Sequence, residues 1–385
     1  MAKVKRLFLV FLLSLVPTLL IWIPFLAKLK SFWGIPLPQD GMAVVVANYD
    51  GPLFLVVAKT LYNLEQIGLN YSFPLPLEYY AAHFPLFPLL IRLFSFILGY
   101  PYAMLLVTLV SSFLALYFFN RLIRRYVKAG AALWLTAVFA VLPARWLIVR
   151  SVGSAEPLFV ASIIASMYYF QREKYWRAGI WGMVAAATKS PGILLFVSYF
   201  LYLIVPQARR LIFSPVATWL KLTKINRAYP IFLIPLSVLA VFVFYQFTFN
   251  DFLAYFHSGD NIHLFLLPFS IFNFSSPWVG TAWLEEIIFV YLFGALGLLK
   301  LIKQKRYELA TFVGIFFFSI LFVSHRDLIR YALPIVPFLF VAFNQTLTKK
   351  DFKKVFFLLL LPIYLFSLAF IAQSAMPISN WAPFL

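Results

Sequence analysis

Long apolar stretches separated by short polar clusters recur along almost the whole chain. A helix of about 20 residues crosses the apolar core of a bilayer, so each stretch is a candidate membrane span. Strands of membrane barrels are only about ten residues long, so the lengths favour helices. The pattern predicts spans at 7–27, 101–119, 130–149, 157–171, 192–206, 230–249, 284–302, 308–324, 328–347 and 355–372.

Two apolar segments are too short to be assigned by length. Residues 84–99 form only about 24 Å of helix, and Arg92 in mid-membrane would cost about 2.5–3.5 kcal/mol. We therefore interpret this segment as an interfacial helix. Residues 178–190 are counted as a half-helix ending at Pro191, because this choice keeps the later basic clusters on one side of the membrane. The expected fold is all-α and polytopic, with about 11 transmembrane helices.

Composition agrees with a membrane protein. The chain of 385 residues is 63% hydrophobic and 12% charged, with a mean hydropathy of +0.91. A soluble globule could not hide so much apolar surface, which excludes soluble enzymes and disordered binding proteins. The lack of cysteine excludes disulfide scaffolds, thiolate metal sites and cysteine nucleophiles.

The net charge of +19 reflects membrane topology rather than nucleic-acid binding. Basic residues occur as short clusters between apolar runs, and most of them fall on the side predicted to be cytoplasmic. All but three of the 13 carboxylates and all 4 histidines fall on the outer side. We expect the chemistry on that extracytoplasmic face, with no nucleic-acid partner.

Two outer segments are longer than ordinary connections. They are the first external loop, 28–99, which includes the interfacial helix, and a second large loop, 250–283. No repeat is visible. The simplest partition is one transmembrane domain, 1–385, with these two external loops.

The first external loop contains the segment NYDGPLF, residues 48–54. Asp50 lies there beside aromatic residues at a membrane surface, where partial desolvation suits a carboxylate that acts as a general base. Asp50 is therefore the catalytic candidate. The alternative is a turn residue that starts a helix. His83, in the same loop, is added as a candidate substrate contact.

The turn SVGSAEPLF, residues 151–159, places Glu156 between two apolar spans. Its carboxylate could bind sugar hydroxyls. Equally, Glu156 could cap the helix that follows, since Pro157 suits a first helical turn.

Lys189 lies at membrane depth in ATKSPGILLF, residues 187–196. A charge at a helix break inside the membrane is costly and usually functional, so the position implies an anionic partner such as a lipid phosphate. The alternative is a lysine that extends to the interface.

The segment HRDLIRYALPIVPF, residues 325–338, has several polar residues at the start of an apolar span. Arg326 and Arg330 are four apart and share a helical face if the helix has begun. Their guanidinium groups can bind phosphate oxygens in a bidentate manner, with Asp327 orienting an arginine and Tyr331 close by. The alternative is an ion-pair cluster that seals the outer surface. Four scattered histidines make a metal site improbable.

These segments, in this order, resemble the PIG-V family of membrane mannosyltransferases, which add the second mannose of GPI anchors, and its prokaryotic relatives. The resemblance rests on NYDGPLFLVVAK, FPLFPLLIRL, SVGSAEPLF, ATKSPGILL and RYALPIVPF. Tyr49 stands where the family usually has tryptophan, and Lys189 where it usually has arginine.

The resemblance implies a GT-C-type glycosyltransferase fold and an integral membrane enzyme with an extracytoplasmic active site. The host membrane would be a prokaryotic plasma membrane, or the endoplasmic reticulum of a eukaryote. The donor would be a polyprenyl-phosphate sugar, and a mannosyl group would pass to a lipid-linked or glycan acceptor by inverting displacement, without cofactor or metal. Asp50 would be the base. Glu156, Lys189, Arg326, Asp327, Arg330, Tyr331 and His83 would bind substrate.

Two other classes remain open. A transporter or lipid flippase needs ionisable groups near the bilayer midplane and access from both faces. A purely structural membrane scaffold would leave Lys189 and the arginine-rich segment without a role.

Overall fold

Helices account for nearly all regular structure in the computed structural model, which describes residues 2–213, 226–259, 263–273 and 281–385. The strands in these ranges are β1 (Ser31–Phe32) and β2 (Ile35–Pro36), which pair antiparallel with Phe32 opposite Ile35. The chain folds as two compact units. The first comprises Met1–Ala161, Ala240–Asn261 and Gln345–Leu385, and the second Ser162–Leu239 and Ile262–Asn344.

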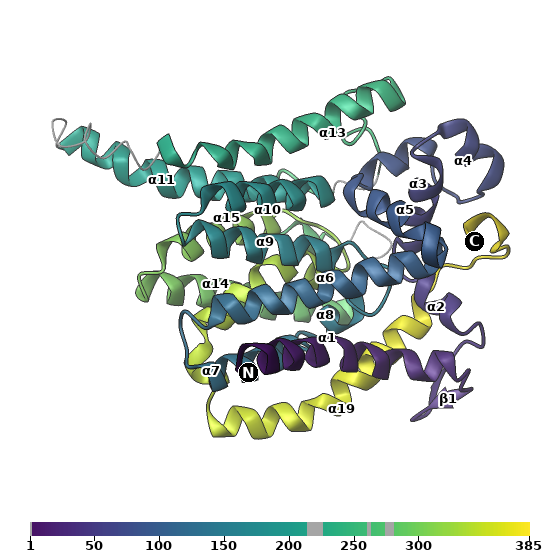
Figure 1. Ribbon diagram of the computed structural model, residues 1–385, viewed down its shortest axis with the longest axis horizontal. Coiled ribbons are helices and arrows are strands. Elements are labelled where there is room, and N and C mark those ends of the chain that lie inside the picture. The colour runs from purple at the N-terminus through teal and green to yellow at the C-terminus, as the bar shows by residue number, and fades with distance from the viewer. Residues whose placement is uncertain (1, 214–225, 260–262, 274–280) are drawn as a thin grey trace. The chain divides into compact units, whose positions relative to one another are not determined.

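The first unit is built around long apolar helices with a cluster of short helices from the first external loop. Its α1 packs against both α6 and α19 (Figure 1). Its elements are α1 (Ala2–Leu26), α2 (Met42–Val46), α3 (Gly51–Thr60), α4 (Leu64–Asn70), η1 (Leu77–Ala82), α5 (Leu86–Leu98), α6 (Tyr100–Ile123), α7 (Ala129–Phe139), α8 (Ala144–Val149), α19 (Lys350–Gln373) and η7 (Ala382–Phe384).

The second unit is built mainly of helices, and its α15 packs against α11 and α14. Its elements are α10 (Tyr175–Thr188), η2 (Ser190–Gly192), α11 (Ile193–Phe213), η4 (Tyr229–Phe232), η5 (Ser270–Phe272), α14 (Thr281–Lys303), α15 (Tyr307–Ile320), α16 (Leu328–Ala332), η6 (Leu333–Ile335) and α17 (Val336–Ala342). Three helices begin in one unit and end in the other: α9 (Glu156–Phe170), α13 (Leu233–Phe249) and α18 (Asn344–Leu347).

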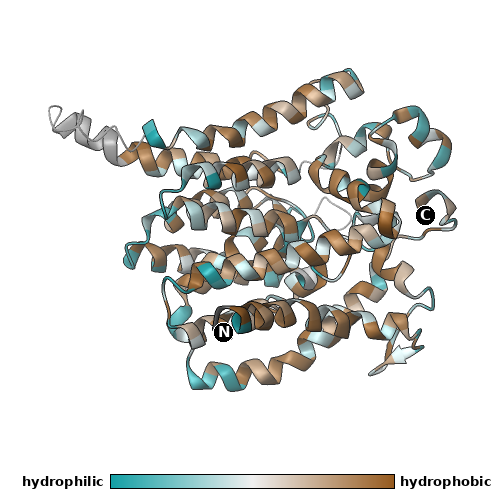
Figure 2. Ribbon diagram, in the orientation of Figure 1, coloured by the Kyte–Doolittle hydropathy of each residue, from teal (hydrophilic) through white to brown (hydrophobic). Residues whose placement is uncertain are grey.

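Four helices among the described residues are long and apolar enough to cross a membrane. They are Val4–Leu26, Tyr100–Ile123, Tyr229–Phe249 and Lys350–Gln373. Shorter apolar helices make up much of the remainder, and Figure 2 shows hydrophobic residues along the helices of both units. The protein is an integral membrane protein.

Two predicted spans are interrupted rather than continuous. The span at 130–149 is divided into α7 and α8, because Pro143 lacks the N–H that would continue a helix. The span at 328–347 is helical from Leu328 to Ala342, with a 3-10 turn at Pro334, and is interrupted at Phe343 before α18. Apolar length alone cannot reveal such breaks.

Helix α5 has the two faces that an interfacial helix needs. Phe87 and Ile91 are buried, whereas Leu93 and Phe96 are exposed. The Arg92 guanidinium donates hydrogen bonds to backbone carbonyls at the C-terminal end of α3, at 3.0 and 2.9 Å. Arginine favours this position because the last carbonyls of a helix lack partners and bear partial negative charge.

Arg150, which follows α8, is fully buried in the first unit. Its guanidinium donates to the backbone carbonyls of Ala140 and Ser14 and to the Ser14 hydroxyl. A buried charge is stable only where such acceptors replace water. Arg150 therefore ties α1 to the end of α7.

Candidate functional site

Asp50 lies at the start of α3 in the first unit, where it is half-buried. The alternative interpretation was a residue that starts a helix, and Asp50 does occupy the N-cap position. Its side chain, however, makes no capping hydrogen bond there. The backbone carbonyl of Asp50, which accepts from the Phe54 N–H, therefore begins α3.

The backbone on each side of Asp50 is fixed by buried contacts. The Asn48 side chain, 0% exposed, donates a 2.7 Å hydrogen bond to the Ile371 carbonyl, and the Met376 N–H donates to Ala47. A Cβ on Gly51 would lie 2.2 Å from the Val46 carbonyl oxygen, so only glycine fits. These contacts hold the Asp50 backbone against the end of α19.

Tyr49, which precedes Asp50, has a left-handed backbone with a φ of 49°. Its hydroxyl accepts a 3.1 Å hydrogen bond from Arg145 of α8. The Arg145 guanidinium also lies 3.9 Å from the centre of the Phe370 ring. Strained backbone of this kind persists where surrounding contacts enforce it and is common at functional sites. Arg145 thus places a positive charge beside the Asp50 loop.

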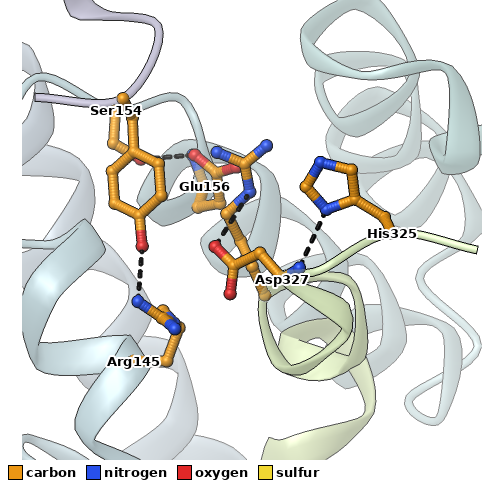
Figure 3. Close-up of polar contacts among 7 residues, drawn as sticks. Arg145, Ser154, Glu156, His325 and Asp327 are labelled. Atoms are coloured by element: carbon orange, nitrogen blue, oxygen red, sulfur yellow. Dashed lines mark hydrogen bonds and ion pairs between the residues drawn. The ribbon is translucent and has the colours of Figure 1, made fainter. Parts of the chain in front are cut away.

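Glu156 is the first residue of α9 and is only 5% exposed. The Ser154 hydroxyl donates to its carboxylate and accepts from its backbone N–H at 3.3 Å (Figure 3). Thr108 of α6 in turn exchanges 3.2 Å hydrogen bonds with the backbone of Ser154. The helix-start role is therefore real, and the same bonds hold the carboxylate in one orientation.

Met104 of α6 brings the two acidic segments together. A Cβ on Gly51 would lie 3.3 Å from its methyl carbon, and one on Gly153 would lie 2.2 Å from the same atom. The Asp50 loop and the Glu156 turn therefore pack on one side chain. We call Tyr49, Asp50, Arg145, Ser154 and Glu156 the acidic cluster.

His83 is 6% exposed and lies against α3 rather than at a surface. Its ring meets that of Phe54 edge-on, with 5.0 Å between centroids, and its carbonyl accepts a 2.5 Å hydrogen bond from Tyr62. Through these contacts with Phe54 and Tyr62, His83 helps to hold the first external loop in place.

Lys189 lies in the second unit, between the end of α10 and η2. The predicted break is present: α10 ends at Thr188, and Gly192 packs so closely on Ala186 that an added Cβ would lie 2.5 Å from its backbone. Lys189 is half-buried at this break.

Lys189, Arg326 and Arg330 gather around His325. The pKa of His325 is lowered to about 3, chiefly by burial. Smaller causes are nearby positive charges, namely those of His263, Arg330, Arg326 and Lys189. We call these five residues, with Asp327 and Tyr331, the cationic cluster.

A hydrogen bond to its ring, in addition to burial, favours the neutral form of His325. Its Nδ1 accepts a 3.0 Å hydrogen bond from the Asp327 backbone N–H (Figure 3), which requires that Nδ1 carry no proton. The His263 ring lies 4.3 Å away and the Tyr331 ring 5.2 Å. His263 belongs to a separate segment of the chain, which pairs with the residues just before His325. Leu264 forms a β-bridge with Val323, and the Ser324 N–H donates a hydrogen bond to the His263 carbonyl.

The two arginines do not share a helical face, because α16 begins at Leu328, after Arg326. Asp327 instead lies at the N-cap and forms an ion pair with Arg330, with 3.8 Å between Oδ2 and Nε. Asp327 is only 8% exposed. The expected orienting contact is thus present, through a different local geometry.

Arg145, Ser154, Met104 and His263 were missed from the sequence. Only Arg145 had a local signal, because it is a charged residue within a predicted span. The part of the chain that the structure describes has no group of three or more His, Asp or Glu side chains placed to bind a metal ion.

The structure is similar to that of ArnT from Cupriavidus metallidurans bound to undecaprenyl phosphate. The match covers 97% of this chain and 75% of that chain, with a TM-score of 0.57 and 14% sequence identity. The chain therefore has a GT-C-type fold. This confirms the expected all-α polytopic membrane architecture. At this identity the likeness establishes the fold alone.

No protein-family sequence model and no curated protein matches the chain. The resemblance to the PIG-V family and the roles of the site residues stay predictions.

Proposed function

We propose that this protein is a membrane glycosyltransferase that uses a polyprenyl-phosphate sugar as donor. Support comes from the GT-C-type fold, because the ArnT structure that shares it binds undecaprenyl phosphate. Further support comes from the side chains: one unit holds the half-buried Asp50 near the buried Glu156, and the other gathers cations around a neutral histidine.

In the proposed reaction, Asp50 accepts the proton of an acceptor hydroxyl as its oxygen attacks the anomeric carbon. The bond between that carbon and the phosphate oxygen breaks, and the electron pair leaves with the polyprenyl phosphate. One displacement inverts the anomeric configuration. Lys189, Arg326 and Arg330 stabilise the charge gained by the leaving phosphate, which is commonly the largest contribution to such catalysis.

Other residues have supporting roles. Glu156 and Tyr331 bind sugar hydroxyls, Asp327 orients Arg330, and His83 positions the loop of Asp50. The PIG-V-like segments make mannose the first sugar to test, with a lipid-linked or glycan acceptor on the extracytoplasmic face. No cofactor or metal takes part in the proposed steps.

The test is transfer from a radiolabelled polyprenyl-phosphate mannose by purified protein in detergent. Asp50→Asn should lower transfer by about a thousandfold or more, because a neutral amide cannot take the proton. Its melting temperature and donor binding should match those of the wild type. The control is Asp251→Asn, which removes an exposed carboxylate paired with His257 at 2.6 Å and should retain activity.

Substantial transfer by Asp50→Asn would falsify the base assignment. Movement of lipid between leaflets of sealed vesicles, without any sugar transfer, would instead establish a flippase.

A further inference from the structure

An apolar groove of about 550 Å³ lies on the second unit between α10 and the segment formed by η4 and α13. Its lining includes Trp176, Tyr229, Phe232, Leu236 and Leu239. These side chains are about half exposed, so the groove opens outward. In a membrane protein, such a surface faces lipid chains.

A basic pocket of about 390 Å³ adjoins this groove. Lys174, Arg177 and Arg227 line it together with one carboxylate, Glu173. Trp176 lines both spaces, so they lie next to each other. The surface therefore places an apolar groove beside a positively charged pocket.

Close packing gives the groove a fixed floor. A Cβ on Gly179 would lie 2.1 Å from the Pro230 carbonyl oxygen, so glycine is what allows α10 to approach η4. The rings of Trp176 and Tyr229, which both line the groove, meet edge-on with 5.5 Å between their centroids. Tryptophan and tyrosine favour the level of lipid headgroups, because their rings are amphipathic.

We propose that this surface binds one anionic phospholipid, with an acyl chain in the groove and the phosphate on Lys174, Arg177 and Arg227. Three cations against one carboxylate match a phosphodiester, and basic pockets between membrane helices are suited to anionic headgroups. The Glu173 carboxylate can accept a hydrogen bond from a headgroup hydroxyl. A free phosphate ion would bind only in the basic pocket and would leave the apolar groove empty. The site is separate from the residues of the proposed glycosyl transfer.

The first experiment compares the melting temperature of purified protein in non-ionic detergent with added phosphatidylglycerol, phosphatidylcholine or inorganic phosphate. Phosphatidylglycerol should raise it by about 3 °C or more, and the other two should not. The double variant Lys174→Gln, Arg177→Gln should lose this rise. The control Lys303→Gln, Lys305→Gln removes two cations of the same unit outside the pocket and should keep it.

The second experiment detects the lipid chain directly. Brominated phosphatidylglycerol should quench tryptophan fluorescence more in the wild type than in Trp176→Phe, and brominated phosphatidylcholine should show a smaller difference. Equal quenching by both lipids, or stabilisation by inorganic phosphate alone, would overturn the proposal. So would an unchanged melting-temperature rise in the double variant of the pocket.

Discussion

The acidic cluster and the cationic cluster differ in how their charged side chains are held in place. In the acidic cluster, backbone positions are held by buried hydrogen bonds, as between Asn48 and Ile371, and by a close contact that only Gly51 allows. In the cationic cluster, Arg326 is exposed and Lys189 and Arg330 are half-buried at helix ends.

The difference follows from what each cluster is proposed to do. A general base must reach its proton within hydrogen-bond distance, so its position must be exact to a fraction of an ångström. A charge acts over several ångströms, so long cationic side chains need less exact placement. The backbone contacts that fix Asp50 and the exposed side chain of Arg326 therefore suit proton transfer and phosphate binding respectively.

The largest effect should come from the packing of the acidic cluster. Gly51→Ala places a methyl group 2.2 Å from the Val46 carbonyl oxygen. The loop must shift, at a cost of about 3 kcal/mol or more in the free energy of unfolding. Thermal unfolding measures the loss of stability, and the transfer assay measures the effect on activity. Gly68→Ala is the control, because nothing lies within 4 Å and alanine favours helix α4. Similar stability of the two variants would disprove the tight packing.

The next effect concerns the cationic cluster. Arg326→Gln combined with Arg330→Gln should lower transfer about a hundredfold, since two charges that stabilise the leaving phosphate are lost. The melting temperature should change by only a few degrees. Equal losses of activity and stability would instead favour the alternative role, an ion-pair cluster that seals the surface.

A smaller effect is expected at Tyr49. Tyr49→Phe removes the 3.1 Å hydrogen bond with Arg145, worth about 0.5–1.5 kcal/mol of stability. We expect transfer to fall about tenfold, because Arg145 is then held less firmly. Tyr364→Phe loses a 3.0 Å hydrogen bond to the Leu20 carbonyl away from the cluster. As the control, Tyr364→Phe should lose about as much stability as Tyr49→Phe but keep full transfer activity.

The smallest effect is a dependence on pH. The pKa of His325 is lowered to about 3, so between about pH 6.5 and pH 3 the unfolded chain binds a proton there that the folded protein does not. Stability should therefore fall as the pH drops below about 6.5. His325→Gln should weaken this fall, as measured by melting temperatures from pH 8 to pH 5. An identical slope in the variant would contradict the buried neutral histidine.

The sequence by itself determined that this protein lies in a membrane and that its secondary structure is helical. Apolar length is a property of consecutive residues, so the spans that became α1, α6 and α19 could be located within a few residues. The break at Lys189 was also local, because Pro191 and Gly192 lie two and three residues after it.

Only the tertiary structure decided which residues meet. Gly51 and Gly153 pack on Met104, and Leu264 pairs with Val323 beside His325. These contacts join segments far apart in the chain, and they depend on how helices pack in three dimensions. Hydropathy and spacing describe only neighbours along the chain. They could nominate Asp50 and Lys189, but they could not show that Arg145 contacts Tyr49 or that His263 packs on His325.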